Sequence, residues 1–332
     1  MKIVVLDTAT SNISESEWSN LLSPFGKTVL YRRLEKDPSI TIQRSAEADI
    51  IVTTNQVPFS REIFLHLPKL RLISLISTGY NAIDLQAASE YGVTVTNVPA
   101  YSTESVAQHT MALILELCHQ VTKNNELIRQ NLWKQDPKQT HSQAFVWELT
   151  KRVIGIIGFG NIGRRVAKLA HAFGMEVWGA TRHHDQKPSY VTWKTEEEIF
   201  ASADVVSLHR RLDKAYEGFV NSRLLRLMKP TAFLINTARG KLINETDLIE
   251  ALNQKTIAGA ALDVVAEEPA GTEHPLLHAP NCFITPHMAW NSQRSIKQLL
   301  HIVTENIRAF LEGKPQNVVN LPVASAEILT GV

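Results

Sequence analysis

The sequence predicts an α/β protein of two doubly wound domains, each built on a parallel β-sheet with helices on both faces. Its 332 residues exceed the size at which one hydrophobic core stops growing, so two domains are expected. Short β-branched runs alternate with helix-compatible segments along the chain. Strands that alternate with helices pair in parallel, because each connection crosses back over one face of the sheet.

The strand pattern divides into a first group of four runs and a later group of six. The first group predicts one α/β layer, and the second predicts a complete doubly wound sheet. The expected strands are residues 2–6, 48–53, 70–76 and 93–97, then residues 153–157, 177–180, 205–209, 233–236, 259–264 and 283–285.

Two long helices are predicted near the domain boundaries. Residues 103–130 contain no Gly or Pro, and their apolar residues recur at helical spacing, which predicts one uninterrupted helix. Residues 291–311 have a similar pattern that ends before a glycine and a proline. This second helix would return the chain to the first layer. We therefore expect a discontinuous domain of residues 1–101 plus 290–332, and a second domain of residues 102–289.

Charge and composition argue against several classes of partner. The 34 Lys and Arg balance 33 Asp and Glu, so no overall field attracts nucleic acid or an anionic membrane. Cys118 and Cys282 have neither metal-ligand nor redox spacing. The N-terminal apolar run is too short for a signal peptide, and no run approaches the roughly 20 apolar residues of a membrane span. We expect a cytoplasmic protein with no metal site.

A glycine-rich turn follows the expected strand at residues 153–157. Gly158, Gly160 and Gly163 have the spacing G-x-G-x-x-G, and residues 164–173 after them have a helical pattern. Such glycines allow a tight turn and let the backbone approach a pyrophosphate at a helix N-terminus. The order of strand, glycines and helix predicts a dinucleotide cofactor.

The end of the next strand indicates which dinucleotide binds. A carboxylate about 20 residues beyond the glycines normally bonds the adenosine ribose. Thr181 and Arg182 stand at that place, and the first acid, Asp185, comes later. Arg182 either pairs with the 2′-phosphate of NADP or covers the adenine face. The sequence favours NADP over NAD and keeps both open.

Three polar side chains follow later strands, at the edge where open α/β sheets hold their chemistry. Arg239 has the planar donor geometry that binds a carboxylate through two parallel hydrogen bonds. The imidazole of His287 is suited to pass the proton that accompanies hydride transfer. Glu268 would orient that imidazole, and Glu267 is the competing candidate. The three together predict a catalytic site.

The chain resembles the D-isomer-specific 2-hydroxy-acid dehydrogenase family over almost its full length. Besides the glycine turn, the matching segments are STGYNAID (77–84), TNVPAYSTESVA (96–107), NTARG (236–240), ALDV (261–264) and TPHMAW (285–290). The resemblance implies a Rossmann dinucleotide domain and a flavodoxin-like substrate domain built from both chain ends. It also implies a homodimer and an interdomain cleft that closes over cofactor and substrate.

The resemblance further implies a role for each site residue. Arg239 would bind the substrate carboxylate and carbonyl, His287 would act as acid or base, and Glu268 would pair with His287. Backbone amides at Thr78 and Gly79 would hold the same carboxylate. The implied cofactor contacts are Val106, Gly158, Gly160, Asn161, Ile162, Gly163, Thr181, Arg182, His209, Thr237, Ala238, Asp263, His287 and Ala289.

Segments 98–103 and 287–290 resemble the branch with glycerate dehydrogenase and hydroxypyruvate or glyoxylate reductase. The expected reaction joins hydroxypyruvate or glyoxylate to D-glycerate or glycolate. Trp290 either walls the substrate pocket or packs at the domain hinge. Where the family usually has a proline shortly after His209, this chain has Arg210 and Arg211. These arginines either join Arg182 at an adenosine phosphate or are solvated surface charge.

Two rival functions share this fold. A dinucleotide-sensing, corepressor-like protein would bind the cofactor without turnover, and formate dehydrogenase belongs to the same family. Corepression needs partner surfaces or tails outside the core, whereas nearly all residues of this chain belong to the two predicted domains. The chain also has Arg239, Glu268 and His287. This set also fits a 2-oxo acid better than formate. The sequence therefore favours a 2-hydroxy-acid dehydrogenase.

Overall fold

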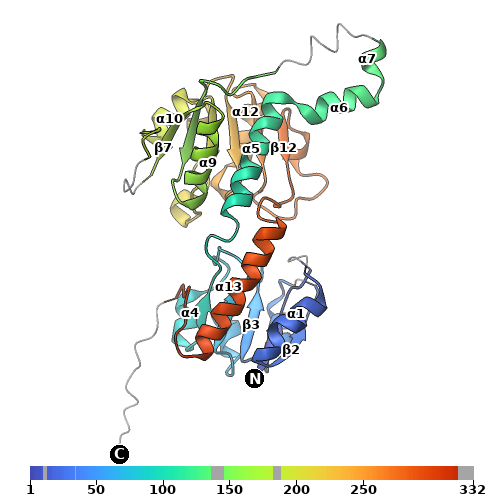
Figure 1. Cartoon of the computed structure of the whole chain (residues 1–332), viewed down its shortest axis with the longest axis vertical. Helices are drawn as coiled ribbons and strands as arrows, with labels where there is room; N and C mark the ends of the chain where they lie inside the picture. The colour runs from blue at the N-terminus through green and yellow to red at the C-terminus, as the bar shows by residue number, and fades with distance from the viewer. Residues whose placement is uncertain (10–12, 34, 136–145, 182–187, 321–332) are drawn as a thin grey trace, which may run out of the picture. The chain divides into compact units, whose positions relative to one another are not determined.

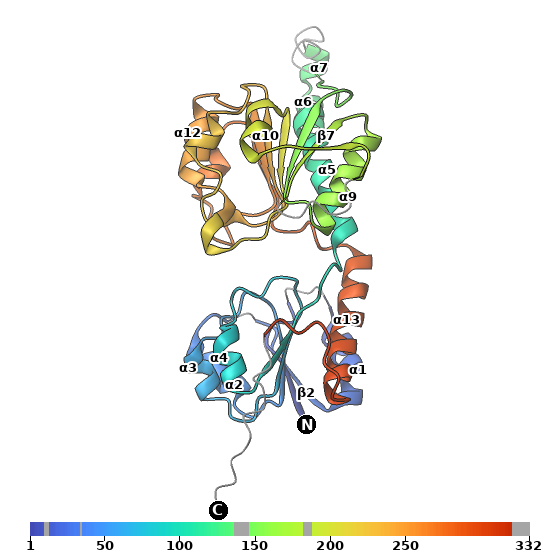
Figure 2. The same ribbon diagram turned by 90° about the vertical axis from the view of Figure 1, so that its left-hand side faces the viewer.

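The chain folds as two compact units. The computed structural model describes all residues except 10–12, 34, 136–145, 182–187 and 321–332. Unit 1 comprises Met1–Tyr101 and Gln293–Val332, and unit 2 comprises Ser102–Ser292. Each unit holds one parallel β-sheet covered by helices on both faces (Figures 1 and 2). The expected α/β class with two parallel sheets is confirmed.

Unit 1 has a five-stranded parallel sheet with the order β2-β1-β3-β4-β5. Its strands are β1 (Lys2–Val5), β2 (Lys27–Leu30), β3 (Ile50–Thr53), β4 (Leu72–Leu75) and β5 (Thr94–Thr96). The sequence predicted four of these strands and missed β2. This strand lies at the edge of the sheet and its side chains stay partly exposed, so its sequence lacks the buried apolar run of a central strand.

The helices of unit 1 cover both faces of this sheet. In Figure 2, α2, α3 and α4 lie on one face, while α1 and α13 lie on the other. On α13, Leu299, Val303 and Ile307 recur every four residues and pack with Trp18 of α1. Burial of each such side chain stabilises the fold by roughly 1.5–3 kcal/mol. The helices are α1 (Glu15–Leu22), α2 (Pro38–Ser45), α3 (Arg61–Leu65), α4 (Leu85–Glu90) and α13 (Gln293–Leu311).

Unit 2 has a seven-stranded parallel sheet with the order β12-β11-β10-β9-β6-β7-β8. Its strands are β6 (Val153–Ile157), β7 (Glu176–Ala180), β8 (Val191–Trp193), β9 (Val205–Leu208), β10 (Phe233–Asn236), β11 (Gly259–Leu262) and β12 (Cys282–Ile284). The expectation of six strands was wrong by one, because β8 is a three-residue edge strand. The strand order reverses between β6 and β9, which is where doubly wound sheets bind ligands.

Two separate cores fill the two faces of this sheet. Helices α5 and α9 cover one face, and α10, α11 and α12 cover the other (Figure 2). The helix α10 begins with a capping box, in which Thr195 and Glu198 each bond the backbone N–H of the other. The long helices are α5 (Thr103–His119), α6 (Val121–Arg129), α9 (Asn161–Ala172), α10 (Glu196–Ser202) and α12 (Glu245–Asn253), and the short ones are α7 (Leu132–Gln135) and α11 (Ser222–Leu225).

The single helix expected over residues 103–130 was wrong. The helix is interrupted at Gln120, whose φ of 50° lies in the left-handed region. The next helix, α6, then runs at an angle to α5 (Figure 1). The carboxylate of Glu116 accepts the backbone N–H of Thr122 at 3.1 Å and so caps α6. This break needs no Gly or Pro, so helical spacing alone did not reveal it.

No helix in the described part of the chain is both long and apolar enough to span a membrane. The same residues bring no three His, Cys, Asp or Glu side chains together in a way that would hold a metal ion.

Candidate active site

The polar residues expected from the sequence meet at one edge of the unit 2 sheet. Gly158 follows β6, His209 follows β9, Arg239 comes shortly after β10, and His287 comes shortly after β12. Because all seven strands are parallel, their carboxyl ends share one edge. We call this the carboxyl edge of unit 2.

The three glycines of the turn after β6 have different physical roles. Gly158 has a φ of +97°, and a Cβ there would lie 2.7 Å from the carbonyl of His209. A Cβ on Gly163 would overlap the carbonyl oxygen of Gly158. A Cβ on Gly160 would meet no atom within 4 Å. Two glycines are therefore required by the protein itself, whereas Gly160 faces open space.

That space fits the pyrophosphate of a dinucleotide. Gly160 is the N-cap of α9, and no side chain caps this end of the helix. The first-turn residues Asn161 and Ile162 are exposed and half-buried, respectively. A helix start of this kind offers backbone N–H groups and a positive dipole end to an anion. When bound, a nicotinamide dinucleotide supplies or accepts a hydride at this edge.

His209 stays neutral at the carboxyl edge. Its Nε2 lies 2.9 Å from the hydroxyl of Ser207, and burial lowers the pKa of His209 to about 3. The imidazole therefore carries no charge at working pH, and any contact with a phosphate would be a neutral hydrogen bond.

Arg210 is not solvated surface charge, which was one of the two roles expected for it. Its guanidinium pairs with Glu196 of α10 and lies over the rings of Tyr216, at 4.0 Å, and Phe219, at 4.7 Å. Thr181 directly follows β7, while Arg182, on which the NADP expectation rests, lies outside the described residues.

The turn that carries Arg239 is built by Asn236, the last residue of β10. The Asn236 side chain accepts the N–H of Ala238 at 3.0 Å and donates to the carbonyl of Arg239 at 2.9 Å. Arg239 is half-buried, and its Nη1 donates to the carbonyl of Ala238 at 2.7 Å. The buried Thr237 completes the turn. These bonds fix the backbone from which the guanidinium projects.

The next glycine holds this turn against its neighbour. A Cβ on Gly240 would overlap the carbonyl of Val265, in the loop after β11. The backbone of the Arg239 turn therefore packs directly on the loop that carries Glu268, and only glycine permits this approach.

His287 and Glu268 form a close polar pair in the site. Nδ1 of His287 lies 2.6 Å from Oε2 of Glu268, whose other oxygen accepts the N–H of Val265 at 3.2 Å. Glu267, the competing candidate, is exposed and makes no such contact. An ionised carboxylate only accepts, so Nδ1 carries the hydrogen and Nε2 is left for a substrate.

Asp263, directly after β11, organises the chain around His287. Its side chain is 1% exposed and accepts hydrogen bonds from the hydroxyl of Thr285 and from the backbone N–H groups of Met288 and Ala289. Burial acts to raise the pKa of Asp263, but the hydrogen bonds from His109, Thr285, Ala289 and Met288 outweigh it and lower the pKa. Asp263 is therefore a buried carboxylate whose charge is stabilised by hydrogen bonds from the protein in place of water.

The remaining expected contacts have less distinctive surroundings. Val106, in α5, and Ala289 are buried, and Trp290 is half-buried. In unit 1, Thr78 and Gly79 follow β4, and the Thr78 carbonyl accepts a bond from the side chain of Asn97 at 2.8 Å. Within the described residues, the backbone N–H groups of Thr78 and Gly79 donate no hydrogen bond.

The sequence did not single out His109, whose Nε2 lies 3.0 Å from the hydroxyl of Thr285. Histidine on a mostly apolar helix gives no signal of this contact, because the partner is 176 residues away in sequence.

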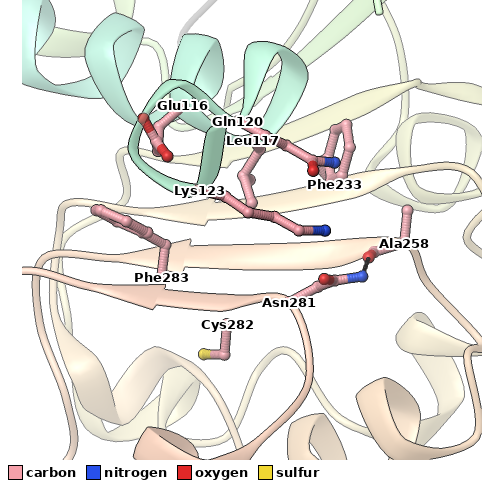
Figure 3. Close-up of a pocket in the computed structure, with 9 residues that line it drawn as sticks. All are labelled: Glu116, Leu117, Gln120, Lys123, Phe233, Ala258, Asn281, Cys282 and Phe283. Atoms are coloured by element: carbon pink, nitrogen blue, oxygen red, sulfur yellow. Dashed lines mark hydrogen bonds between the residues drawn. The ribbon is translucent and has the colours of Figure 1, made fainter. Parts of the chain in front are cut away.

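The cavity drawn in Figure 3 belongs to the opposite edge of the unit 2 sheet. It has a volume of about 290 Å³ and contains none of the expected site residues. Burial, together with the nearby Glu245 carboxylate, raises the pKa of its Cys282 thiol to about 12, so this thiol is not a nucleophile. The cavity is lined by Glu116, Leu117, Gln120, Lys123, Phe233, Ala258, Asn281, Cys282 and Phe283.

A glycine turn of this geometry at the strand-order reversal is typical of proteins that bind a nicotinamide dinucleotide. Residues 111–289 match the model for the NAD binding domain of D-isomer specific 2-hydroxyacid dehydrogenases. This match covers more than half of the chain, which therefore belongs to the D-isomer specific 2-hydroxyacid dehydrogenase family of oxidoreductases. The resemblance inferred from the sequence is confirmed.

Relatives and solved structures match nearly end to end. The hydroxypyruvate reductase of Blautia hydrogenotrophica is 38% identical over 96% of this chain and 100% of its own. The glycerate dehydrogenase of Methylorubrum extorquens is 34% identical, over 85% and 88% of the two chains. An acyclic imino acid reductase in complex with NADPH and D-Arg has a TM-score of 0.86 at 29% identity, and D-lactate dehydrogenase from Aquifex aeolicus with NAD and lactic acid has 0.83 at 27%. They cover 96% and 95% of this chain, and 100% and 96% of their own.

The different surroundings of two glycines predict different outcomes for the same substitution. In Gly160→Ala the added methyl meets no protein atom, so the melting temperature should stay the same while NAD(P)H binds at least about tenfold more weakly, measured by nucleotide fluorescence titration. In Gly163→Ala the methyl overlaps Gly158, so the melting temperature should fall. Unchanged affinity in Gly160→Ala would show that the pyrophosphate does not approach this residue.

Proposed function

We propose that this protein reduces hydroxypyruvate or glyoxylate with a nicotinamide dinucleotide, and oxidises the corresponding 2-hydroxy acid in reverse. The observation that carries the proposal is the 2.6 Å pair of His287 and Glu268 at the sheet edge that also holds the Arg239 turn and the open helix start. The names of the relatives, hydroxypyruvate reductase and glycerate dehydrogenase, support this substrate class.

The side chains divide the chemistry between them. Arg239 binds the substrate carboxylate and polarises the carbonyl, because its fork of N–H donors matches a carboxylate. Nε2 of His287 donates a proton to the carbonyl oxygen as the carbonyl carbon receives the hydride, which yields the hydroxyl group. Glu268 keeps the Nδ1 hydrogen in place and stabilises the charged imidazole. Backbone N–H groups of Thr78 and Gly79 bind the same carboxylate, and Trp290 walls the pocket.

We propose NADP as the favoured cofactor, with NAD as the alternative. The sequence has Thr181 and Arg182, rather than a carboxylate, directly after β7, and an arginine at this place would pair with a 2′-phosphate. The remaining cofactor contacts come from Val106, Asn161, Ile162, Thr237, Ala238, Asp263 and Ala289.

We further propose that the protein is a homodimer, joined through the arm formed by α6 and α7. None of the α6 side chains is buried, and Val121, Ile128 and Trp133 are 63%, 42% and 52% exposed. Apolar side chains gathered on an arm that extends from its own unit (Figure 1) are typical of a contact with another copy.

The reaction is tested by following the nicotinamide absorbance as NADPH or NADH is oxidised by each of a panel of 2-oxo acids. The rival activity, formate dehydrogenation, is tested by following the reduction of NADP⁺ or NAD⁺ by formate. Hydroxypyruvate or glyoxylate should give the highest kcat/KM, and NADPH should exceed NADH. Cofactor binding without turnover of any 2-oxo acid would contradict the proposal and favour a dinucleotide-sensing protein.

His287→Ala removes the proton donor while the glycine turn stays intact. Turnover should fall by about 100- to 10,000-fold, and the Kd for the cofactor should change little. Rapid-mixing kinetics and fluorescence titration measure the two quantities. Glu267→Gln, at the exposed neighbour of Glu268, is the matched control and should retain wild-type turnover. If His287→Ala kept wild-type turnover, the acid-base assignment would be wrong.

Charge placed on the apolar arm should dissociate the dimer. The double variant Ile128→Glu/Trp133→Glu should sediment as a monomer at concentrations where the wild type sediments as a dimer, because carboxylates cannot be buried in an apolar interface. Asn125→Glu, at an exposed polar position of the same helix, adds charge without removing an apolar contact and should remain dimeric. A monomeric wild type would refute the proposal.

A further inference from the structure

One helix contacts the loops that carry two of the candidate catalytic side chains, Arg239 and His287. On α5, the Ser105 hydroxyl donates to the Ala289 carbonyl at 2.6 Å, and His109, one turn later, reaches Thr285. The hydroxyl of Thr110 lies 3.0 Å from that of Thr237, in the turn before Arg239. Residues 105 and 109 share one helix face, so α5 holds the two sides of the 285–289 segment at once.

The hydrogen bonds fix which nitrogen of His109 carries a hydrogen. Thr285 has one hydroxyl hydrogen, and it is donated to Oδ1 of Asp263 at 2.6 Å. The hydroxyl can therefore only accept from His109, whose Nε2 lies 3.0 Å away and 3.4 Å from the same Oδ1. Nε2–H of His109 thus points at the Thr285 and Asp263 oxygens together.

This network determines the backbone at His287. Asp263 accepts the N–H groups of Met288 and Ala289, both at 2.9 Å, and its own carbonyl accepts the N–H of His287 at 2.8 Å. His287 has a φ of 50°, a left-handed conformation that is uncommon for residues with a Cβ. The carboxylate of Asp263 constrains this turn through the residues that follow His287.

We propose that His109 is a positioning residue for the reaction. Through Thr285 and Asp263 it holds the left-handed turn that directs the His287 imidazole, without itself touching the reacting atoms. Its side chain is only 18% exposed, and its donor lies within reach of a buried carboxylate. Its loss would remove one of the four donors that hold the Asp263 carboxylate against the Met288 and Ala289 amides, and so weaken that hold. This inference rests on the proposed role of His287.

The kinetic test compares three variants of the full-length protein. His109→Ala should lower kcat for the best 2-oxo acid by about 10- to 100-fold, since small displacements of a catalytic group cost that much, while KM stays within about threefold. His109→Gln keeps an N–H donor and should recover most of the lost kcat. His119→Ala removes the other histidine of α5, at the far end of the helix, and should match the wild type.

Hydrogen exchange gives a readout that does not depend on turnover. In His109→Ala, amides in a peptide spanning residues 285–291 should exchange at least about tenfold faster than in the wild type, as judged by mass spectrometry. Peptides from α9 should be unchanged. Thr285→Val, which removes the hydroxyl between His109 and Asp263, should give the same two effects, and the double variant should be no worse than the poorer single one.

The outcomes separate this inference from the proposed function. If the wild type is active and His287→Ala is inactive, but His109→Ala has wild-type kcat and exchange, the positioning role is refuted and the proposed function stands. If His109→Gln is as impaired as His109→Ala, the donor is not what matters, and the inference is likewise refuted. If the wild type reduces no 2-oxo acid, the proposed function fails, while the exchange measurement still reports whether His109 holds the turn.

Discussion

The site depends on parallel pairing in the unit 2 sheet. Only a parallel arrangement brings the carboxyl ends of β6, β9, β10, β11 and β12 to one edge, although the segments are far apart in sequence. The residues that follow these strands then meet without any local sequence relationship. The glycine turn, the Arg239 turn and the His287 turn are consequences of this single constraint.

Close backbone approaches convert neighbouring loops into one rigid surface. Gly158 lies against the backbone of His209, and Gly240 lies against the backbone of Val265. Loops from adjacent strands therefore cannot shift independently, because a displacement of one would force the other. Such coupling suits a site where a guanidinium and an imidazole must hold a small substrate within hydrogen-bond distance.

The buried Asp263 carboxylate keeps its charge because the protein supplies its hydrogen-bond donors. Asp263 is almost fully removed from solvent, and four donors replace the water that an ionised carboxylate would otherwise need. His209 differs from Asp263, because burial without a charged partner lowers its pKa and keeps the imidazole neutral.

The sequence by itself determined the fold class, the central strands, the glycine turn and the family, because each is written in local pattern: buried apolar runs, helical spacing and short motifs. It missed the edge strands β2 and β8, whose short, half-exposed segments lack that pattern. It also missed the helix break at Gln120, where the Glu116 side chain accepts a hydrogen bond from the start of α6. Only the tertiary structure distinguished Glu268 from Glu267, took Arg210 into a pair with Glu196, and brought His109 to Asp263. These contacts join residues that are remote in sequence. Local sequence patterns therefore cannot predict them, because they do not determine the distances between such residues.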